Sequence, residues 1–304
     1  MTIDDFKNKI ILGDNLDVLR QIPSNTIDLI YTDPPFNTGG TCTTEKASFK
    51  DKYNSQNHFI EFLRDRIVEC KRVLKKNGSF YLHIGPRNSH YVKIMLDEVF
   101  GIGNFKREII VNSTPISIQQ TRSNFMEDTE RIFFYINGGK HTFNMIYVPY
   151  KTKNLKDSYK FDDNDGRGLY AINTCYFNHS EQTMKKFQDD GVIVGWTRTG
   201  RCFLKKVYLK DKHMKGNPLG NVWMNTKRKK STANMYPTEK PLDLLERIIL
   251  VSSNEGDLVL DPFNGGGTTC VAAKSLGRNY IGIDISKDSI DYTNRRLQQT
   301  LLKI

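Results

Sequence analysis

One stretch of the chain constrains the fold most: residues 258–285, where two apolar runs flank a glycine-rich turn and a helical segment. It opens as "LVLDPFNGGGTT" and closes as "YIGIDIS". We expect strands at 258–260 and 280–285, with a helix that begins at Thr268 between them. A strand, a helix and a second strand in this order form a βαβ unit, whose two strands lie parallel in one sheet. The stretch therefore predicts an α/β fold.

The glycine turn of this unit has two interpretations. Glycines let the backbone turn sharply and approach a ligand closely, and a helix N-terminus adds partial positive charge. The turn can equally serve only to pack a strand tightly against a helix, and its spacing completes neither G-x-x-x-x-G-K nor G-x-G-x-x-G. Asp284 ends the second strand, where an acid commonly binds ribose hydroxyls. The combination favours a cofactor that contains adenosine.

A second turn, "YTDPPFNTGG" at residues 31–40, follows an expected strand at 27–31. Pro34 and Pro35 fix φ and lack backbone donors, so neither a strand nor a helix continues through them. Pro34 also pushes Asp33 toward extended geometry. The result is a stiff turn that holds a carboxylate, free carbonyls and the ring of Phe36 close together. Taken alone, it is also what an ordinary strand-ending turn looks like.

The remaining apolar runs extend the α/β pattern around a polar middle stretch. We expect further strands at 9–12, 79–84, 108–111 and 131–136, and helices at 58–74 and 241–252, with Asn77-Gly78 ending the first helix. Residues 141–230 are rich in Lys, Asn, Asp, Gly and Tyr and show weak periodicity. The pattern predicts one sheet domain in two parts, 1–140 and 231–304, interrupted by an insert at 141–230.

Composition limits the classes of partner. The chain has 304 residues, 38% of them hydrophobic, and a net charge of +11, which suggests a folded protein with a polyanionic partner. Nucleic acid is the simplest such partner, and an anionic membrane surface is the alternative. No apolar run approaches the length of a spanning helix, and "MTIDDFKNKI" is unlike a signal peptide, so we expect a cytoplasmic protein. The five scattered cysteines form no C-x-x-C pair, so we expect neither disulfides nor a metal.

Together these stretches resemble the amino-group DNA methyltransferases that use S-adenosylmethionine. D-P-P-[YF], here residues 33–36, is their catalytic motif, and F-x-G-x-G-T, here residues 263–268, is their cofactor motif. The catalytic motif comes first, which resembles the circularly permuted beta class. The similarity extends to "ILGDNLDVLRQIPSNTIDLI", "DGRGLY", "GNPLGNVW" and "YPTEKPLDLLERII" and covers most of the chain. It implies a Rossmann-like sheet with helices on both faces and a target-recognition region in the insert.

The chain departs from the family pattern at a few positions. Phe36 replaces the commoner tyrosine, and Asn264 and Gly266 fill variable positions of the glycine loop. Thr129 and Glu130 stand where the family usually has a His-Glu pair. None of these changes removes a group that the chemistry needs.

The resemblance assigns roles to the catalytic turn, Asp33, Pro34, Pro35 and Phe36. The Asp33 carboxylate and the Pro34 carbonyl would accept the two N–H groups of a target amine, which is a poor nucleophile until it becomes pyramidal. Phe36 would stack on a base flipped out of the duplex. Asp33 also favours adenine N6 over cytosine N4, because the N4 members more often carry serine at that position.

The same resemblance assigns the residues of the cofactor site. Phe263, Gly265, Gly267 and Thr268 would line the methionine end, Asp284 would hold the ribose, and Asp14 would lie near the adenine. Thr238 and Lys240 of "YPTEKP" would close the pocket, although Lys240 can also be read as a solvated lysine at a helix start. The complete predicted set is Asp14, Thr238, Lys240, Asp261, Phe263, Gly265, Gly267, Thr268 and Asp284.

The insert carries four consecutive basic residues, Lys227, Arg228, Lys229 and Lys230. A charge run is usually a solvated face, but in a chain of this charge and motif content we expect contacts with DNA phosphates. The predicted partner is double-stranded DNA, with a cognate restriction endonuclease and a homodimer left open. The competing functions are methylation of cytosine N4, of RNA adenine or of protein glutamine, and DNA binding without catalysis.

Overall fold

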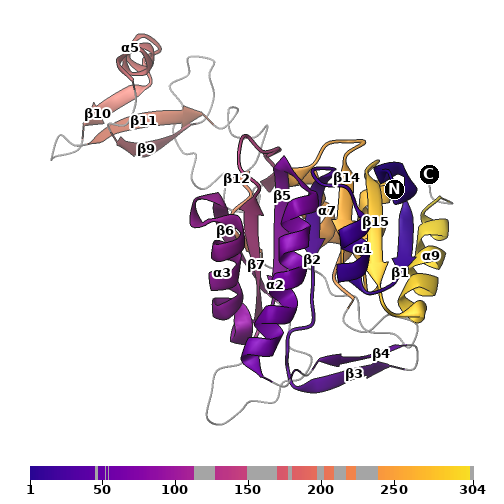
Figure 1. The fold of residues 1–304 in the computed structure, drawn as a ribbon. Coiled ribbons are helices and arrows are strands. Elements are labelled where there is room, and N and C mark those ends of the chain that lie inside the picture. Colours follow the sequence, from indigo (N-terminus) through magenta and orange to yellow (C-terminus); the bar gives the residue numbers. More distant parts are fainter. Residues whose placement is uncertain are drawn as a thin grey trace. The chain divides into compact units, whose positions relative to one another are not determined.

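The computed structural model describes residues 1–44, 47–51, 53, 55–112, 127–148, 170–176, 180–196, 202–208, 217–223 and 239–301. The backbone divides into two compact units (Figure 1). The first unit comprises Met1–Asn144 and Gly220–Ile304, and the second comprises Met145–Leu219. The first unit therefore joins the two ends of the chain around the central stretch.

An eight-stranded sheet forms the centre of the first unit in its described part. In spatial order its strands are β1 (Lys9–Leu12), β15 (Asn279–Asp284), β14 (Leu258–Asp261), β2 (Ile27–Thr32), β5 (Leu74–Ile84), β7 (Thr129–Ile136), β6 (Phe105–Asn112) and β13 (Val222–Trp223). Neighbouring strands are parallel except β7, which is antiparallel to both β5 and β6. A hairpin of β3 (Gly40–Thr44) and β4 (Ala47–Asp51) follows β2.

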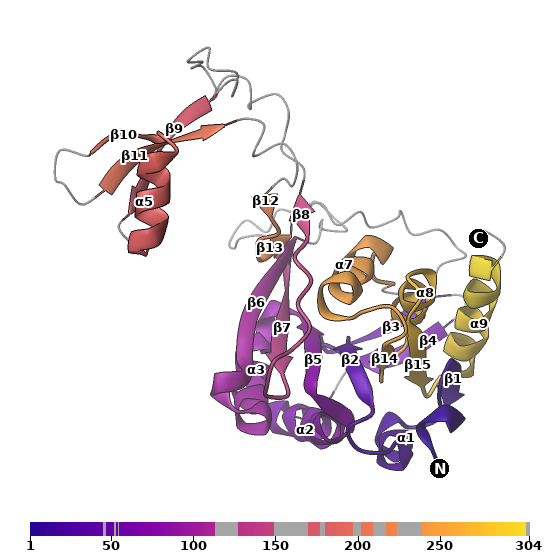
Figure 2. The same cartoon turned by 90° about the horizontal axis from the view of Figure 1, so that it is seen from above.

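Helices cover both faces of this sheet (Figure 2). On one face lie α1 (Asn15–Gln21), α2 (Gln56–Val73) and α3 (Pro86–Phe100), and on the other α7 (Leu242–Ser252), α8 (Thr268–Ser275) and α9 (Lys287–Leu301). The 3₁₀ turns η1 (Ile3–Asp5) and η2 (Ile102–Asn104) precede β1 and β6. This α/β architecture, with helices on both faces of a mostly parallel sheet, confirms the predicted fold class.

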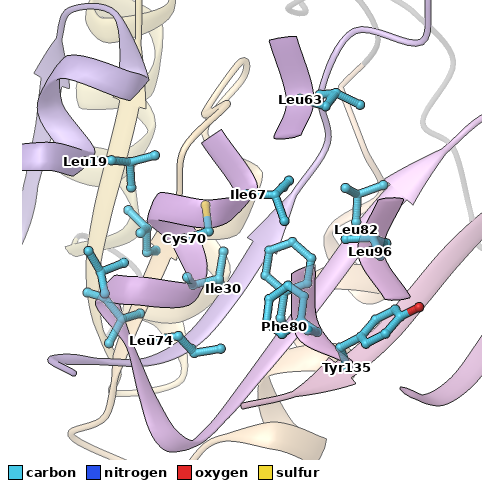
Figure 3. Packing of buried hydrophobic residues seen from close by; sticks show 14 of the residues in the cluster. Leu19, Ile30, Leu63, Ile67, Cys70, Leu74, Phe80, Leu82, Leu96 and Tyr135 are labelled. Carbon is cyan, nitrogen blue, oxygen red and sulfur yellow. The ribbon is translucent and has the colours of Figure 1, made fainter. Parts of the chain in front are cut away.

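The core lies between α2 and the central strands (Figure 3). Phe59, Leu63, Ile67 and Cys70 of α2 recur every three or four residues, so one face of the helix is buried. Phe80 of β5 packs in the same cluster. Complete burial of such a side chain stabilises the fold by about 1.5–3 kcal/mol. This packing holds the ends of the strands in place.

The pairing of β14 with β2 brings together two parts of the chain that are far apart in sequence. Val259 pairs with Leu29 and Leu260 with Ile30. From β14 the chain continues to β15 on one side, and from β2 it continues to β5 on the other. Ligands of open α/β sheets bind at the carboxyl ends of strands where the connections diverge in this way. The crevice for a ligand is therefore expected at the ends of β14 and β2.

The second unit contains a small antiparallel sheet in the order β10 (Ile193–Trp196), β11 (Cys202–Tyr208) and β9 (Tyr170–Tyr176). Between β9 and β10 runs α5 (Glu181–Asp189), and Lys205 Nζ of β11 lies 3.3 Å from the centroid of the Phe187 ring on α5. β8 (Tyr147–Val148) pairs with β12 (Asn217–Pro218). The weak periodicity of this region gave no basis for predicting these elements. Its role in target recognition stays a prediction.

The first predicted helix ends earlier than Asn77-Gly78, so that prediction was wrong. α2 stops at Val73, because Leu74 is already extended and begins β5. Ile27 pairs with Leu74 and Leu29 with Ser79, so the residues from 75 to 78 form an irregularity at the start of the strand. The glycine at 78 therefore lies within β5 and not at a helix end. The strand expected at 79–84 begins five residues earlier, at Leu74, and the other predicted elements agree with the observed ones to within three residues at their ends.

We predict that Gly267→Ala destabilises the protein more than Gly256→Ala does. Both glycines have positive φ, +72° and +84°, so both substitutions carry the left-handed cost of about 1 kcal/mol. At Gly267 a Cβ would also lie 2.3 Å from the Thr293 side chain, whereas at Gly256 it would meet nothing within 4 Å. The overlap should add about 1–3 kcal/mol, measured as the free energy of unfolding in urea. Equal losses for the two variants would contradict this packing.

Candidate active site

Acidic and polar side chains gather at the carboxyl edge of the central strands. Asp33 follows β2, Asp261 ends β14 and Asp284 ends β15. His83 lies one residue before the end of β5, and Glu130 lies near the start of the antiparallel β7, which meets the end of β5. The topology therefore brings five ionisable groups from separate strands to one edge.

The two carboxylate oxygens of Asp33 have different surroundings. Oδ2 lies 3.2 Å from Nζ of Lys240, whose side chain is only 9% exposed. Oδ1 is buried and accepts no hydrogen bond from any residue that the structure describes. A buried acceptor without a partner is costly unless a ligand satisfies it. One oxygen is thus held by an ammonium group, and the other is open to a hydrogen-bond donor.

The Phe36 ring is fixed beside this carboxylate. Asn88 Nδ2 donates a hydrogen bond to the Phe36 carbonyl, and a Cβ at Gly85 would lie 3.1 Å from the ring. Lys240 Nζ lies 4.8 Å from the ring centroid, within range of a cation–π contact. Asn37 then takes a left-handed conformation, φ +56°. The Pro-Pro turn therefore presents an acid and an aromatic ring together, as predicted from the sequence.

Three residues that the sequence did not single out for a role lie behind Lys240. Lys240 Nζ is 3.5 Å from Glu130 Oε2, and Glu130 Oε2 is 2.7 Å from His83 Nε2. His83 Nδ1 is 2.8 Å from the Tyr31 hydroxyl. In the sequence, His83 and Tyr31 read only as strand residues, and Glu130 was noted only as part of a departure from the family pattern. Their alignment depends on the pairing of three strands.

The acids at the ends of β14 and β15 organise the glycine loop. Asp261 accepts hydrogen bonds from Thr269 Oγ1 at 2.5 Å and from the Phe263 amide at 3.0 Å. Asp284 Oδ2 accepts from the Gly265 amide at 2.7 Å. Gly265 has φ +50°, a conformation that glycine adopts readily. Asp261 therefore shapes the start of the loop and Asp284 holds its middle, with lone pairs remaining for a ligand.

Asp14 is joined to the glycine loop through two residues that the sequence did not reveal. It caps α1 by accepting from the Leu16 amide at 2.8 Å and pairs with the Arg66 guanidinium at 2.9 Å. Arg66 donates to Asn15 Oδ1 at 2.6 Å, and Asn15 Nδ2 donates to the Pro262 carbonyl at 2.7 Å. Asp14 thus follows β1, and its neighbours connect this strand to the loop.

A clamp from α9 holds the other side of the loop. The Arg296 guanidinium donates to the Gly266 carbonyl and to Thr268 Oγ1, the latter at 3.1 Å. The same side chain pairs with Glu239 at 2.9 Å. Glu239 directly precedes Lys240 in the sequence. α9 therefore links the glycine loop to the segment that carries the active-site lysine.

Burial raises the pKa values of two acids at this edge, Asp261 and Asp284. Burial raises the pKa of Asp261 to about 7, against the hydrogen bonds from Thr269 and Phe263, with Asp33 and Asp284 adding to the rise. Burial also raises the pKa of Asp284, although hydrogen bonds from backbone amides oppose it. Neighbouring negative charges stabilise a cation in such a site. The edge is suited to a positively charged ligand.

Several predicted residues cannot be placed. Thr238, Lys227, Arg228, Lys229 and Lys230 lie outside the described residues. In the part of the chain that the structure describes, no group of three or more His, Cys, Asp or Glu side chains is arranged to hold a metal ion. Within the same residues, no helix has both the length and the apolar character required to cross a membrane.

Comparison with known proteins agrees with this geometry. The family model described as a DNA methylase, of the N6/N4 type, matches residues 27–295. The chain belongs to this DNA methylase family. The DNA adenine methyltransferase YhdJ of Escherichia coli strain K12 is 31% identical to it over 95% of this chain and 82% of YhdJ. The Type II methyltransferase M.HpaI of Haemophilus parainfluenzae is 30% identical over 95% of this chain and 74% of M.HpaI.

The fold agrees with a solved structure of a methyltransferase. The complex of M1.HpyAVI with S-adenosylmethionine superposes with a TM-score of 0.54 at 18% identity, over 95% of this chain and 98% of that chain. The predictions of the family, of an enzyme that methylates DNA and of S-adenosylmethionine as the methyl donor are confirmed. The roles of the individual site residues stay predictions.

We predict that Asp261→Asn removes a pH-dependent loss of stability. The folded-state pKa of Asp261 is raised from 3.8 to about 7, so the folded protein holds this proton more tightly than the unfolded chain. Between these values the free energy of unfolding of the natural protein should fall as pH rises, and the loss is complete above about 7. The difference in unfolding free energy between the natural protein and Asp261→Asn, measured in urea at several pH values, isolates this contribution. A difference that is independent of pH would contradict it.

Proposed function

We propose that this DNA methylase transfers a methyl group from S-adenosylmethionine to the N6 amino group of adenine in double-stranded DNA. The observation that carries the proposal is the Asp33 carboxylate, with one oxygen held by Lys240 and the other buried and open. An amino group brings two N–H donors, and the open Oδ1 is an acceptor for one of them. The Pro34 carbonyl on the same stiff turn is the proposed acceptor for the second.

The residues of the turn act by position and charge. The exocyclic nitrogen of adenine is a weak nucleophile, because its lone pair is delocalised into the ring. Acceptors on both N–H groups favour a pyramidal nitrogen, and they stabilise the positive charge that develops on it during attack. Asp33 is well suited to this role because its carboxylate is held before the substrate arrives. Phe36 offers the ring face on which a flipped base stacks.

The described residues fit the cofactor. S-adenosylmethionine supplies an electrophilic methyl group on a sulfonium cation when it is bound. Asp33 and Asp284 bring carboxyl groups to this edge, and Asp261 adds a further negative charge when it is ionised, which suits a cation. Gly265 and Gly267 keep the loop free of side chains, and their positive φ values let the backbone approach a ligand closely. In this proposal Phe263, Gly265, Gly267 and Thr268 lie at the methionine end, and Asp284 binds the ribose.

The remaining assignments concern Lys240, Asp14 and the partners. The contact of Lys240 with Asp33 supports a position beside the target amine. We also propose that Lys240 and Thr238 close the cofactor pocket. Asp14 is proposed to lie near the adenine of the cofactor. We further propose that the protein is cytoplasmic and that the insert reads the DNA site. M.HpaI is named a Type II methyltransferase, which supports a restriction endonuclease as a functional partner. A homodimer stays a prediction.

Adenine is preferred over the competing substrates. The relative YhdJ is named a DNA adenine methyltransferase, and Asp33 occupies the position where N4 members more often have serine. The family model covers both N6 and N4 types, so cytosine N4 is the second candidate. Incubation with tritiated cofactor and DNA, RNA or protein separates the substrate classes. Mass spectrometry of nucleosides from the methylated DNA then separates adenine from cytosine, and a product of N4-methylcytosine alone would overturn the adenine assignment.

We predict that Asp33→Ala lowers kcat for DNA methylation by at least about 10²-fold, because it removes an acceptor that acts in the transition state. Cofactor affinity, measured by titration calorimetry, should change little. Asp17→Ala is the matched control, since Asp17 is an exposed acid of the same unit, on α1, with a side chain that is 73% exposed. That control should keep full activity. Near-normal turnover of Asp33→Ala would disprove the mechanism.

We predict that replacing Lys227, Arg228, Lys229 and Lys230 with glutamine weakens DNA binding about equally for all sequences. If these side chains bind phosphates, the slope of log affinity against log salt should fall by roughly 0.9 for each phosphate that is no longer neutralised. Cofactor affinity and sequence preference should persist, because phosphate contacts position the protein and base contacts specify the site. An unaltered salt slope would show that the run is a solvated face.

A further inference from the structure

We propose that Glu130 is a positioning residue for methyl transfer, which holds the Lys240 ammonium against Asp33 Oδ2 and is itself held by His83 and Tyr31. The proposal rests on the proposed function in one respect, that Asp33 accepts a hydrogen bond from the target amine. Glu130 need not touch either substrate. It acts through Lys240.

The first step is the position of the Lys240 ammonium between two carboxylates. Nζ lies 3.2 Å from Asp33 Oδ2 and 3.5 Å from Glu130 Oε2. Both acids are largely buried, with side chains 19% and 13% exposed, and Lys240 is more buried still. At this depth charges attract more strongly than at the surface. An ammonium group drawn by two fixed carboxylates is localised along two directions, whereas one carboxylate would leave it free to pivot.

The second step is the support behind Glu130. His83 is fully buried, and a buried imidazole requires partners for both nitrogens. Nδ1 lies 2.8 Å from the Tyr31 hydroxyl. Nε2 lies 2.7 Å from Glu130 Oε2 without meeting the geometry of a hydrogen bond. The contact is therefore chiefly electrostatic. His83 thus lies between Tyr31 and Glu130 in one connected series.

The hydrogen-bonding groups of Tyr31 and His83 are arranged to support Glu130. Burial, with a smaller contribution from the charges of Asp33, Asp261 and Glu130, raises the pKa of Tyr31 well above its usual value. Tyr31 therefore remains a phenol, and its hydroxyl shares a hydrogen bond with Nδ1 of His83. The Glu130 carboxylate has only acceptor oxygens, so a hydrogen on Nε2 is the arrangement that suits this contact. Glu130 Oε2 thus faces His83 Nε2 on one side and the Lys240 ammonium on the other.

The third step is the effect on Asp33. Its Oδ2 is fixed by the Lys240 ammonium, so the plane of the carboxylate is fixed and the open Oδ1 keeps a constant direction. Displacement of a reacting group by about 1 Å can lower a rate about 10²-fold. Stability alone does not account for the arrangement, because buried ion pairs contribute little or unfavourably to folding once desolvation is counted. The geometry points to orientation of the acceptor for the target amine.

Glu130→Gln tests the proposal, because it keeps the shape of the side chain and removes its charge. We expect kcat to fall about 10- to 100-fold while KM for DNA and for the cofactor changes less than about threefold. Glu108→Gln is the matched control. Glu108 belongs to β6, and its Oε1 lies 3.1 Å from Nε of Arg131. Its ion pair thus involves neither Asp33 nor Lys240. This control should leave kcat unchanged. If kcat of Glu130→Gln equals that of the unsubstituted protein, the proposal is wrong.

A double-mutant cycle separates positioning from an independent effect. If Glu130 acts through Lys240, the variant that combines Glu130→Gln with Lys240→Met should be no slower than Lys240→Met alone. Multiplied losses would show that Glu130 acts separately and would overturn the proposal. Tyr31→Phe removes only the hydroxyl and provides a milder variant if Glu130→Gln does not fold. It should lower kcat about two- to tenfold, again without a further loss in the Lys240→Met background.

A measurement that needs no turnover distinguishes this proposal from the proposed function. Acetic anhydride labels lysines, and peptide mass spectrometry gives the rate at Lys240. We expect labelling at Lys240 to be several-fold faster in Glu130→Gln than in the natural protein, and unchanged in Glu108→Gln. Equal labelling in all three would overturn the positioning role even if DNA is methylated. A natural protein that does not methylate DNA would overturn the proposed function and leave the labelling result to decide the role of Glu130.

Discussion

The pairing of β14 with β2 is the contact on which the rest of this structure depends. Neither strand is next to the other in sequence, and the second unit lies between them along the chain. Their parallel register places Asp261 near Asp33 of the Pro-Pro turn, and the connections diverge on either side. A slip of one residue would turn the buried side chains of β2 toward the opposite face. The apolar core under α2 therefore fixes this register and, with it, the positions of Asp33 and Asp261.

The three aspartates at this edge have different partners, and the difference fits the reaction. The hydrogen bonds of Asp261 and Asp284 to loop amides and to a hydroxyl make the acids part of the architecture. Asp33 is different, because a lysine holds one oxygen and the structure offers the other to a ligand. Fixed dipoles and charges that need no rearrangement at the moment of reaction are the most effective means of stabilising a transition state. The same fold thus contains two acids that shape the glycine loop and one, Asp33, that we propose as the acceptor of the target amine.

The sequence predicted those features that depend on local chemistry. The prolines at 34 and 35, the glycine loop and the acid at 284 follow directly from backbone geometry and from the resemblance to the family. His83 and Glu130 could not be paired in advance, because nothing local relates a residue of β5 to one of β7 until the antiparallel pairing of these strands is known. Arg66 and Arg296 were missed for a similar reason, since surface-type residues on helices reveal nothing of the loops that they reach. The small sheet of the second unit lacks the alternation that identifies strands.

The clamp formed by Arg296 has a consequence for how the sequence can change over time. One guanidinium contacts the glycine loop and also pairs with Glu239, the neighbour of Lys240. Substitutions at 239 and 296 are therefore coupled, because removal of either charge leaves the opposite charge largely buried and uncompensated. A lineage that alters one of these positions is expected to pass through a poorly folded intermediate or to change both together. The C-terminal helix thus restricts the drift of a segment more than fifty residues upstream.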